Sequence, residues 1–85
     1  MSFTLARHVT RSATEGGMVL LDERSGRYWQ LNATGATVLE ALLDTGDEAL
    51  AAAALRERCP SAGDRAERDV GRLVAMLRDA GLVVS

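Results

Sequence analysis

The sequence predicts an α+β domain in which a three-stranded antiparallel sheet is followed by three helices. The apolar residues are spaced for short strands before residue 32 and for helices after it. Glycine and proline then divide the second half into three helical segments. Strands followed by helices within 85 residues place the helices on one face of the sheet, and this order fits a winged-helix-like architecture.

Three strands are expected over about residues 3–31. Apolar residues at odd positions between residues 3 and 9 predict the first strand. The apolar run 18–21 is too short for a helix and predicts the second. The polar segment 22–26 ends in glycine and is typical of a hairpin turn, so the second strand should pair with an aromatic third strand at 27–31.

Capping residues predict the first two helices. Asn32 is a suitable N-cap because its side-chain oxygen can accept a hydrogen bond from a free amide of the first turn. Gly46 is a natural end for that helix. Asp47 is expected to cap an alanine-rich second helix that runs through Arg58, before Pro60 prevents its continuation.

A third helix is expected over about residues 64–80, with Gly81 at its C-terminal end. Its predicted buried stripe consists of Ala66, Val70, Leu73 and Leu77. One flank of the stripe then carries Arg65, Asp69, Arg72 and Met76, and the other carries Glu67, Val74 and Arg78. The apolar tail 82–84 should pack back on the core.

Length and composition indicate a single domain over residues 1–85. The hydrophobic fraction of 47% argues against disorder. A lone cysteine, Cys59, and the lack of a signal or membrane-spanning run predict a cytoplasmic protein without a membrane partner. The net charge is −2, and arginines alternate with acidic residues, which makes a poor surface for nucleic acid.

Residues for catalysis are scarce, so we expect no enzymatic activity. His8 and Cys59 are the only histidine and cysteine, too few for a nucleophile–base–orienter set or for a four-ligand metal site. The simpler interpretations are that His8 is an exposed strand residue and that Cys59 is a small, partly buried hydrophobic residue. No glycine-rich phosphate loop is present, and we expect no cofactor.

Two features suggest binding. Tyr28 and Trp29 are adjacent in a strand and must therefore point to opposite faces. Trp29 should face the helices with Leu31, while Tyr28 either is an ordinary surface aromatic or anchors a partner on an edge strand. The flank with Arg72 and Met76 is either a solvated helix face with local ion pairs or the wall of a groove.

The stretch Met18 to Gly35 resembles the PqqD-like family. It reads as an apolar strand, a turn with glycine, then Tyr28-Trp29-Gln30-Leu31-Asn32 and Gly35, and the spacing of Val70, Leu73, Leu77 and Gly81-Leu82 is similar to the family's closing helix. The resemblance covers about residues 5–84. The family consists of recognition domains for ribosomally made, post-translationally modified peptides. The length of the chain and the sequence Tyr28-Trp29-Gln30-Leu31-Asn32 are most similar to the stand-alone version found in lasso-peptide systems.

The resemblance implies a non-catalytic adaptor that binds the leader segment of a precursor peptide. The leader would add a strand to residues 27–31 and lie in a groove beside the third helix. It also implies two partners, a leader-cleaving cysteine protease and an ATP-dependent cyclase. The residues carried over as peptide-binding are Arg27, Tyr28, Trp29, Gln30, Leu31, Asp69, Arg72, Leu73, Met76 and Leu77. The alanine-rich second helix departs from the original pyrroloquinoline-quinone member, so that cofactor pathway is not carried over.

Two other classes of protein compete with the adaptor. A winged-helix DNA-binding regulator would read the major groove with the third helix, but that helix mixes arginine with Glu67, Asp69 and Asp79. An acyl carrier protein has this size and acidity, but it needs a serine at a helix start within Asp-Ser-Leu. No serine in the chain has that context.

Overall fold

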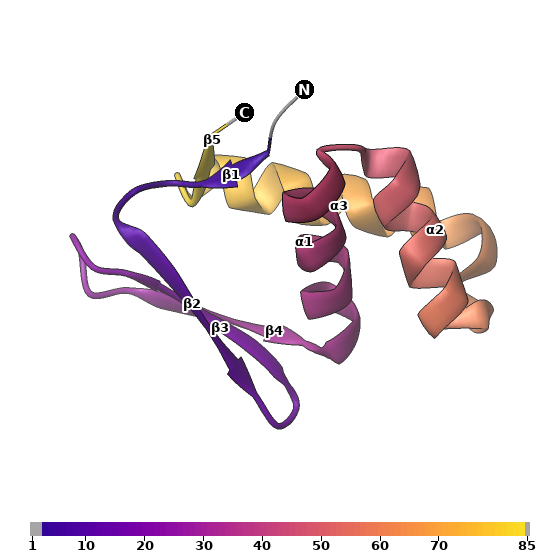
Figure 1. Ribbon diagram of the computed structural model, residues 1–85, viewed down its shortest axis with the longest axis horizontal. Helices are drawn as coiled ribbons and strands as arrows, with labels where there is room; N and C mark the ends of the chain where they lie inside the picture. Colours follow the sequence, from indigo (N-terminus) through magenta and orange to yellow (C-terminus); the bar gives the residue numbers. More distant parts are fainter. Residues whose placement is uncertain (1–2, 85) are drawn as a thin grey trace.

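The computed structural model describes residues 3–84, in which an antiparallel sheet is followed by three helices, as expected. The elements are β1 Thr4–Leu5, β2 Val9–Thr14, β3 Gly17–Asp22, β4 Tyr28–Asn32, α1 Ala33–Thr45, α2 Glu48–Arg58, the 3-10 helix η1 Pro60–Arg65, α3 Ala66–Asp79 and β5 Val83–Val84. Figure 1 shows the sheet on one side of α1 and α2 on the other. The likeness to a winged helix is loose, since the sheet here precedes the three helices.

Strands β2, β3 and β4 form a meander in that order, with β3 in the centre. The expected pairing of the second and third strands is confirmed, with Leu20 opposite Trp29. The prediction for the first strand was wrong. The first strand of the meander is Val9–Thr14, and β1 belongs to a separate two-stranded sheet. Val9 is the only buried residue of β2, so no apolar alternation marked the strand in the sequence.

The first two helices begin and end where their caps predicted. Asn32 Oδ1 accepts a hydrogen bond from the Gly35 amide at 2.8 Å, and Gly46 ends α1 in the left-handed conformation. Asp47 Oδ1 accepts from the Ala49 amide at 2.8 Å and begins α2. The Asn32 cap fixes the point at which β4 turns directly into α1.

The third helix starts later than expected and buries a different stripe. Residues 60–65 form η1, in which Gly63 has a φ of 46° that only glycine adopts freely. The fully buried face of α3 consists of Ala66, Val70, Val74 and Leu77. Val74, expected on a flank, is therefore core, and Leu73, expected in the stripe, is only partly buried. The helix is turned so that Leu73 lies at the border of the core.

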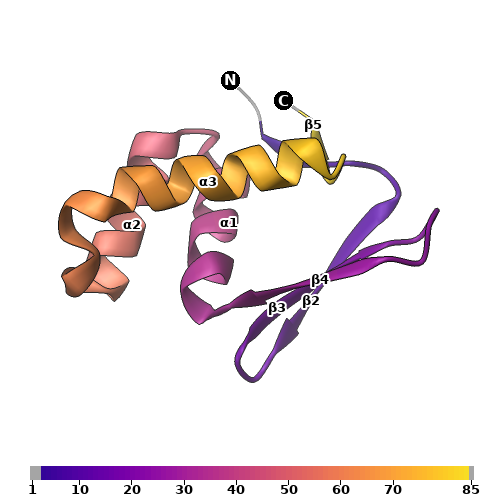
Figure 2. The same cartoon turned by 180° about the vertical axis from the view of Figure 1, so that it is seen from behind.

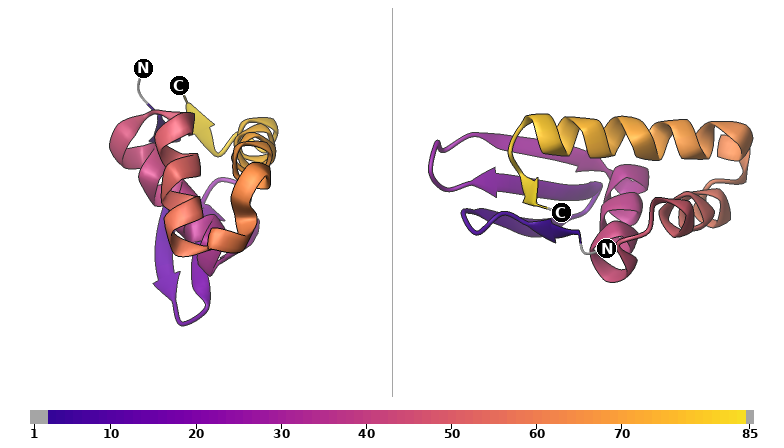
Figure 3. Two further views of the ribbon diagram at one scale, coloured as in Figure 1. Left: turned by 90° about the vertical axis from the view of Figure 1, so that its right-hand side faces the viewer. Right: turned by 90° about the horizontal axis from the view of Figure 1, so that it is seen from above.

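Strands β1 and β5 pair with each other, Thr4 opposite Val84, and bring the two ends of the described chain together (Figure 1). Leu82 is fully buried, so the apolar tail does pack on the core as expected. Helix α3 packs mainly on α2, η1 and β5. Figures 2 and 3 show that it nevertheless runs along the sheet on the side of β4.

Candidate functional site

The candidate site begins with the open edge of β4, which pairs only with β3 among the described strands. The Asp22 amide donates to the Arg27 carbonyl at 2.8 Å, which marks a hydrogen-bonded position next to the turn. Such positions alternate along an antiparallel pair, so Trp29 exchanges its hydrogen bonds with β3. The amide and carbonyl groups of Tyr28 and Gln30 then point away from β3. They form a ready template for another extended chain.

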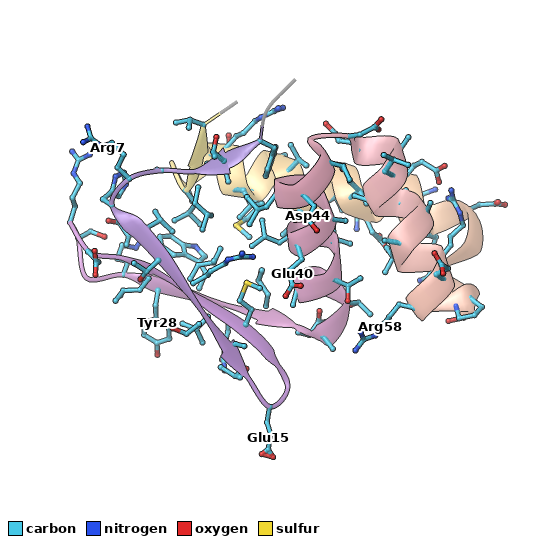
Figure 4. All side chains as sticks on the ribbon, viewed as in Figure 1. Arg7, Glu15, Tyr28, Glu40, Asp44 and Arg58 are labelled. Atoms are coloured by element: carbon cyan, nitrogen blue, oxygen red, sulfur yellow. The ribbon has the colours of Figure 1, made fainter. Side chains whose placement is uncertain are left out.

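The side chains of β4 alternate between two environments. Trp29 and Leu31 are partly buried and pack against the core on the inner face of the sheet. The Arg27 guanidinium lies over the Trp29 ring at 5.1 Å from its centroid, within range of a cation–π contact. Tyr28 and Gln30 are exposed on the opposite face. Tyr28 is 67% exposed and points away from the helices (Figure 4).

Helix α3 contributes the second wall of the site. Leu73 and Met76 are partly buried at the border of the core, beside the exposed residues Asp69 and Arg72. Together with the inner side chains of β4 they form what we call the apolar strip, which consists of Trp29, Leu31, Leu73 and Met76. Because α3 packs mainly on α2, η1 and β5, the side chains of the strip are only partly covered.

A pocket of about 280 Å³ opens at the α1 end of β4. It lies where the end of β4 and the start of α1 meet the end of α2, η1 and the first turns of α3. Its lining is mostly apolar and consists of Asn32, Thr34, Gly35, Val38, Leu55, Cys59, Ala62, Arg65, Asp69 and Leu73. Leu73 belongs to both the apolar strip and the pocket, so the two form one continuous surface.

The structure brings most of the expected site residues together, but not all in the same role. Leu77 is fully buried and supports the wall from beneath. Tyr28 offers its backbone to the open edge, while its side chain lies on the far face of the sheet. Sequence reasoning missed the pocket residues of α2 and η1, such as Leu55 and Ala62. No sequence signal pointed to them, because they meet β4 only through the tertiary fold.

The two residues considered for catalysis are on separate elements. His8 Nε2 lies 3.8 Å from the Asp22 carboxylate near the β3–β4 turn. The Cys59 Sγ lies 3.4 Å from the Ser61 hydroxyl at the end of α2. Within residues 3–84, no cluster of three or more histidine, cysteine or acidic side chains could hold a metal ion. No helix of this part of the chain has the length and apolarity needed to cross a membrane.

The chain is similar to a known protein family and to two solved structures. The family model described as coenzyme PQQ synthesis protein D (PqqD) matches residues 17–83. The solved structure of a lasso peptide synthetase B1 complexed with the leader peptide is 37% identical, with a TM-score of 0.81 and 100% of each chain covered. TbiB1 in complex with the TbiA(beta) leader peptide shares the fold, at 24% identity and a TM-score of 0.77, over 94% of this chain and 93% of that one. No curated protein sequence matches the chain. The match over most of its length shows that the chain belongs to the PqqD family.

Proposed function

We propose that this domain binds the leader segment of a ribosomally made precursor peptide, one of the lasso type, and presents it to processing enzymes. The leader lies as an added strand on β4. The observation that carries the proposal is the open edge of β4 beside the apolar strip and its pocket. An extended peptide there meets free backbone groups on one side and apolar side chains on the other.

The two parts of the site contribute differently to binding. Backbone hydrogen bonds to Tyr28 and Gln30 provide affinity with little dependence on the peptide's sequence. Selectivity comes from peptide side chains that reach Trp29, Leu31, Leu73 and Met76 or enter the pocket. Burying one such side chain contributes about 1.5–3 kcal/mol. A tyrosine and a proline three residues apart, as the family resemblance suggests, are suitable anchors.

A relative supports this role. The lasso peptide synthetase B1 that is 37% identical was solved with a leader peptide bound. The DNA-binding alternative has no such support. The exposed side of α3 mixes its arginines with Glu67, Asp69 and Asp79, so this helix offers no basic face to a phosphate backbone.

The proposal extends to partners and location. The domain has no catalytic role of its own and hands the bound peptide to a leader-cleaving cysteine protease and an ATP-dependent cyclase. A cytoplasmic location fits a small domain with one unpaired cysteine, Cys59.

Calorimetric titration of the full chain with a synthetic leader peptide tests the proposal. We expect saturable one-to-one binding, and replacing either apolar anchor of the peptide by alanine should weaken it ten- to hundredfold. A scrambled peptide of the same composition is the control. Equal affinity for the authentic and scrambled peptides would contradict selective leader binding.

A further inference from the structure

Arg27 stands at the end of the apolar strip that adjoins the β3–β4 turn. Its side chain is exposed, and its guanidinium lies over the Trp29 ring at 5.1 Å from the centroid. No carboxylate of residues 3–84 forms an ion pair with this guanidinium. The groove beside β4 therefore contains a cation whose charge no acidic side chain of the described chain neutralises.

The nearby Asp22 is engaged elsewhere. Its Oδ1 accepts hydrogen bonds from the Arg24 amide at 2.9 Å and from the Ser25 amide at 3.3 Å. The same oxygen lies 3.8 Å from His8 Nε2. The turn also fixes the backbone of Arg27, whose amide donates to the Ser25 hydroxyl at 3.2 Å. The turn thus holds Arg27 in place and leaves its charge for a partner.

A guanidinium that lies over an aromatic ring keeps its hydrogen-bond donors for another group. It carries several N–H groups, and the attraction of its charge to the ring requires none of them. Trp29 is itself partly buried against the core, so it gives the head group of Arg27 a fixed support. Paired N–H groups of a guanidinium match the two oxygens of a carboxylate. A peptide carboxylate is therefore the group that suits Arg27.

The two ends of the site differ in charge. At the α1 end of β4, Asp69 lines the pocket together with Arg65. A peptide carboxylate there would lie close to the carboxylate of Asp69, and two like charges in one site disfavour each other. Arg27 marks the opposite end. An acidic side chain of a bound peptide is therefore favoured at the turn, and an apolar one at the pocket.

The separation of these ends sets a spacing in the peptide. Arg27 and Leu31 share the inner face of β4 and are four residues apart, or about 13 Å along a strand. Asn32, the next residue, already lines the pocket. A paired peptide advances by the same rise and turns every second side chain to this face. Its acidic and apolar side chains should then be four or six residues apart.

We infer that Arg27 selects leaders by binding an acidic side chain of the peptide, and that this contact sets the register of the added strand. The inference rests on the proposed function and deepens it. A shift of two residues along β4 would leave every peptide side chain on its own face, so backbone pairing alone does not choose between such registers. A carboxylate at Arg27 together with an apolar side chain at the pocket fixes one of them.

A double-mutant cycle between the domain and the synthetic leader tests this contact. The domain variants are Arg27→Gln and, as a matched control, Arg24→Gln, which changes an exposed arginine of the same turn. In the peptide, each aspartate or glutamate is replaced in turn by its amide, and an alanine scan locates the apolar anchor. Titration calorimetry measures every combination, and thermal melts verify folding.

We expect Arg27→Gln to weaken leader binding about three- to tenfold and Arg24→Gln to leave it unchanged. One amide replacement, four or six residues from the apolar anchor, should weaken binding to the wild type by the same factor and hardly affect binding to Arg27→Gln. Arg27→Glu should regain affinity for a leader with lysine at that position. The loss should shrink at high salt, because ions screen an exposed pair.

Unchanged affinity in a folded Arg27→Gln domain would overturn the inference, as would a leader that has no acidic residue at this spacing. An equal loss for the leader and all its amide variants would also overturn it, since that pattern assigns Arg27 to packing on Trp29. If the wild type bound no leader, or bound a scrambled one equally well, the proposed function itself would fail instead.

Discussion

Strands β2 and β4 form the two edges of the same sheet, and they differ in what lies beside them. By the same alternation, β2 turns the backbone groups of Arg11 and Ala13 to its open side, whereas the Val9 amide donates to the Ala6 carbonyl. Arg11 stands opposite the buried Leu20 and so places a charge on the inner face. A charge at that position of an edge strand discourages the addition of another chain.

The inner face of β4 carries Trp29 and Leu31 and continues into α3 and the pocket. Both edges offer unpaired amides and carbonyls, so open backbone alone does not define a binding site. The comparison indicates that a selective peptide site needs an apolar wall next to the edge. The predictions below test this difference.

The largest expected effect is a loss of stability at the close contact between β3 and β4. A Cβ added at Gly17 would lie 1.9 Å from the Leu31 carbonyl oxygen, whereas one at Gly16 meets nothing within 4 Å. Gly17→Ala should therefore lower the free energy of unfolding by about 3 kcal/mol, because the backbone of β4 must move. Gly16→Ala should change it by less than about 0.5 kcal/mol. Urea denaturation checks both, and equal stabilities would show that β4 is not held this closely.

The next effect compares the two edges directly. Gln30→Pro removes an outward amide from β4, and Ala13→Pro removes one from β2. Gln30→Pro should weaken leader binding roughly 30- to 100-fold, because a peptide carbonyl is left without its donor. Ala13→Pro should leave the affinity unchanged. Titration calorimetry on both folded variants decides which edge binds, and a larger loss for Ala13→Pro would assign the peptide to β2.

A smaller loss is expected from the helix wall. Met76→Ala removes a partly buried side chain of the apolar strip and should reduce leader affinity about tenfold. Leu50→Ala truncates an exposed side chain on α2 and should have no effect on binding. Fluorescence anisotropy with a labelled leader measures both. If Met76→Ala bound like the wild type, α3 would not be part of the site.

The smallest effect concerns the turn before β4. Burial acts to raise the pKa of Asp22, but hydrogen bonds from the Arg24 and Ser25 amides and the Ser25 hydroxyl, with His8 nearby, hold it below its ordinary value. Because the folded pKa is lowered, the carboxylate stabilises the fold above the unfolded pKa of about 3.9 and loses that contribution as pH falls through the folded value.

Asp22→Asn should therefore flatten the pH dependence of thermal stability below about pH 4. Glu15→Gln, in the turn between β2 and β3, is the control. An identical acid profile for wild type and Asp22→Asn would show that this carboxylate does not stabilise the hairpin.

The sequence predicted well wherever local chemistry decides the structure. Asn32, Gly46 and Asp47 act as caps through contacts with near neighbours in the chain. The opposite faces of Tyr28 and Trp29 follow from strand geometry, and the exposure of the two side chains agrees. That same alternation places the Tyr28 side chain on the face of the sheet opposite the apolar strip.

The sequence predicted poorly wherever distant segments decide. β2 buries only Val9, so its place in the sheet depends on pairing with β3. The rotation of α3 that buries Val74 and frees Leu73 is set by its packing on α2 and β5. The pocket joins five separate elements, and no spacing along the chain reveals such a junction.

The β1–β5 pair has a consequence for the kinetics of folding. The meander and the helices close short loops, whereas pairing Thr4 with Val84 requires the two ends of the described chain to meet. The entropic cost of closing a loop grows with its length, so we expect the β1–β5 pair to form after the local elements. The β1–β5 pair also fixes the C-terminal end of α3, because β5 follows that helix and pairs with β1, which precedes β2 of the meander. The wall beside β4 would then be set in the last step of folding, and a newly made chain would acquire its affinity for peptide only once it is fully folded.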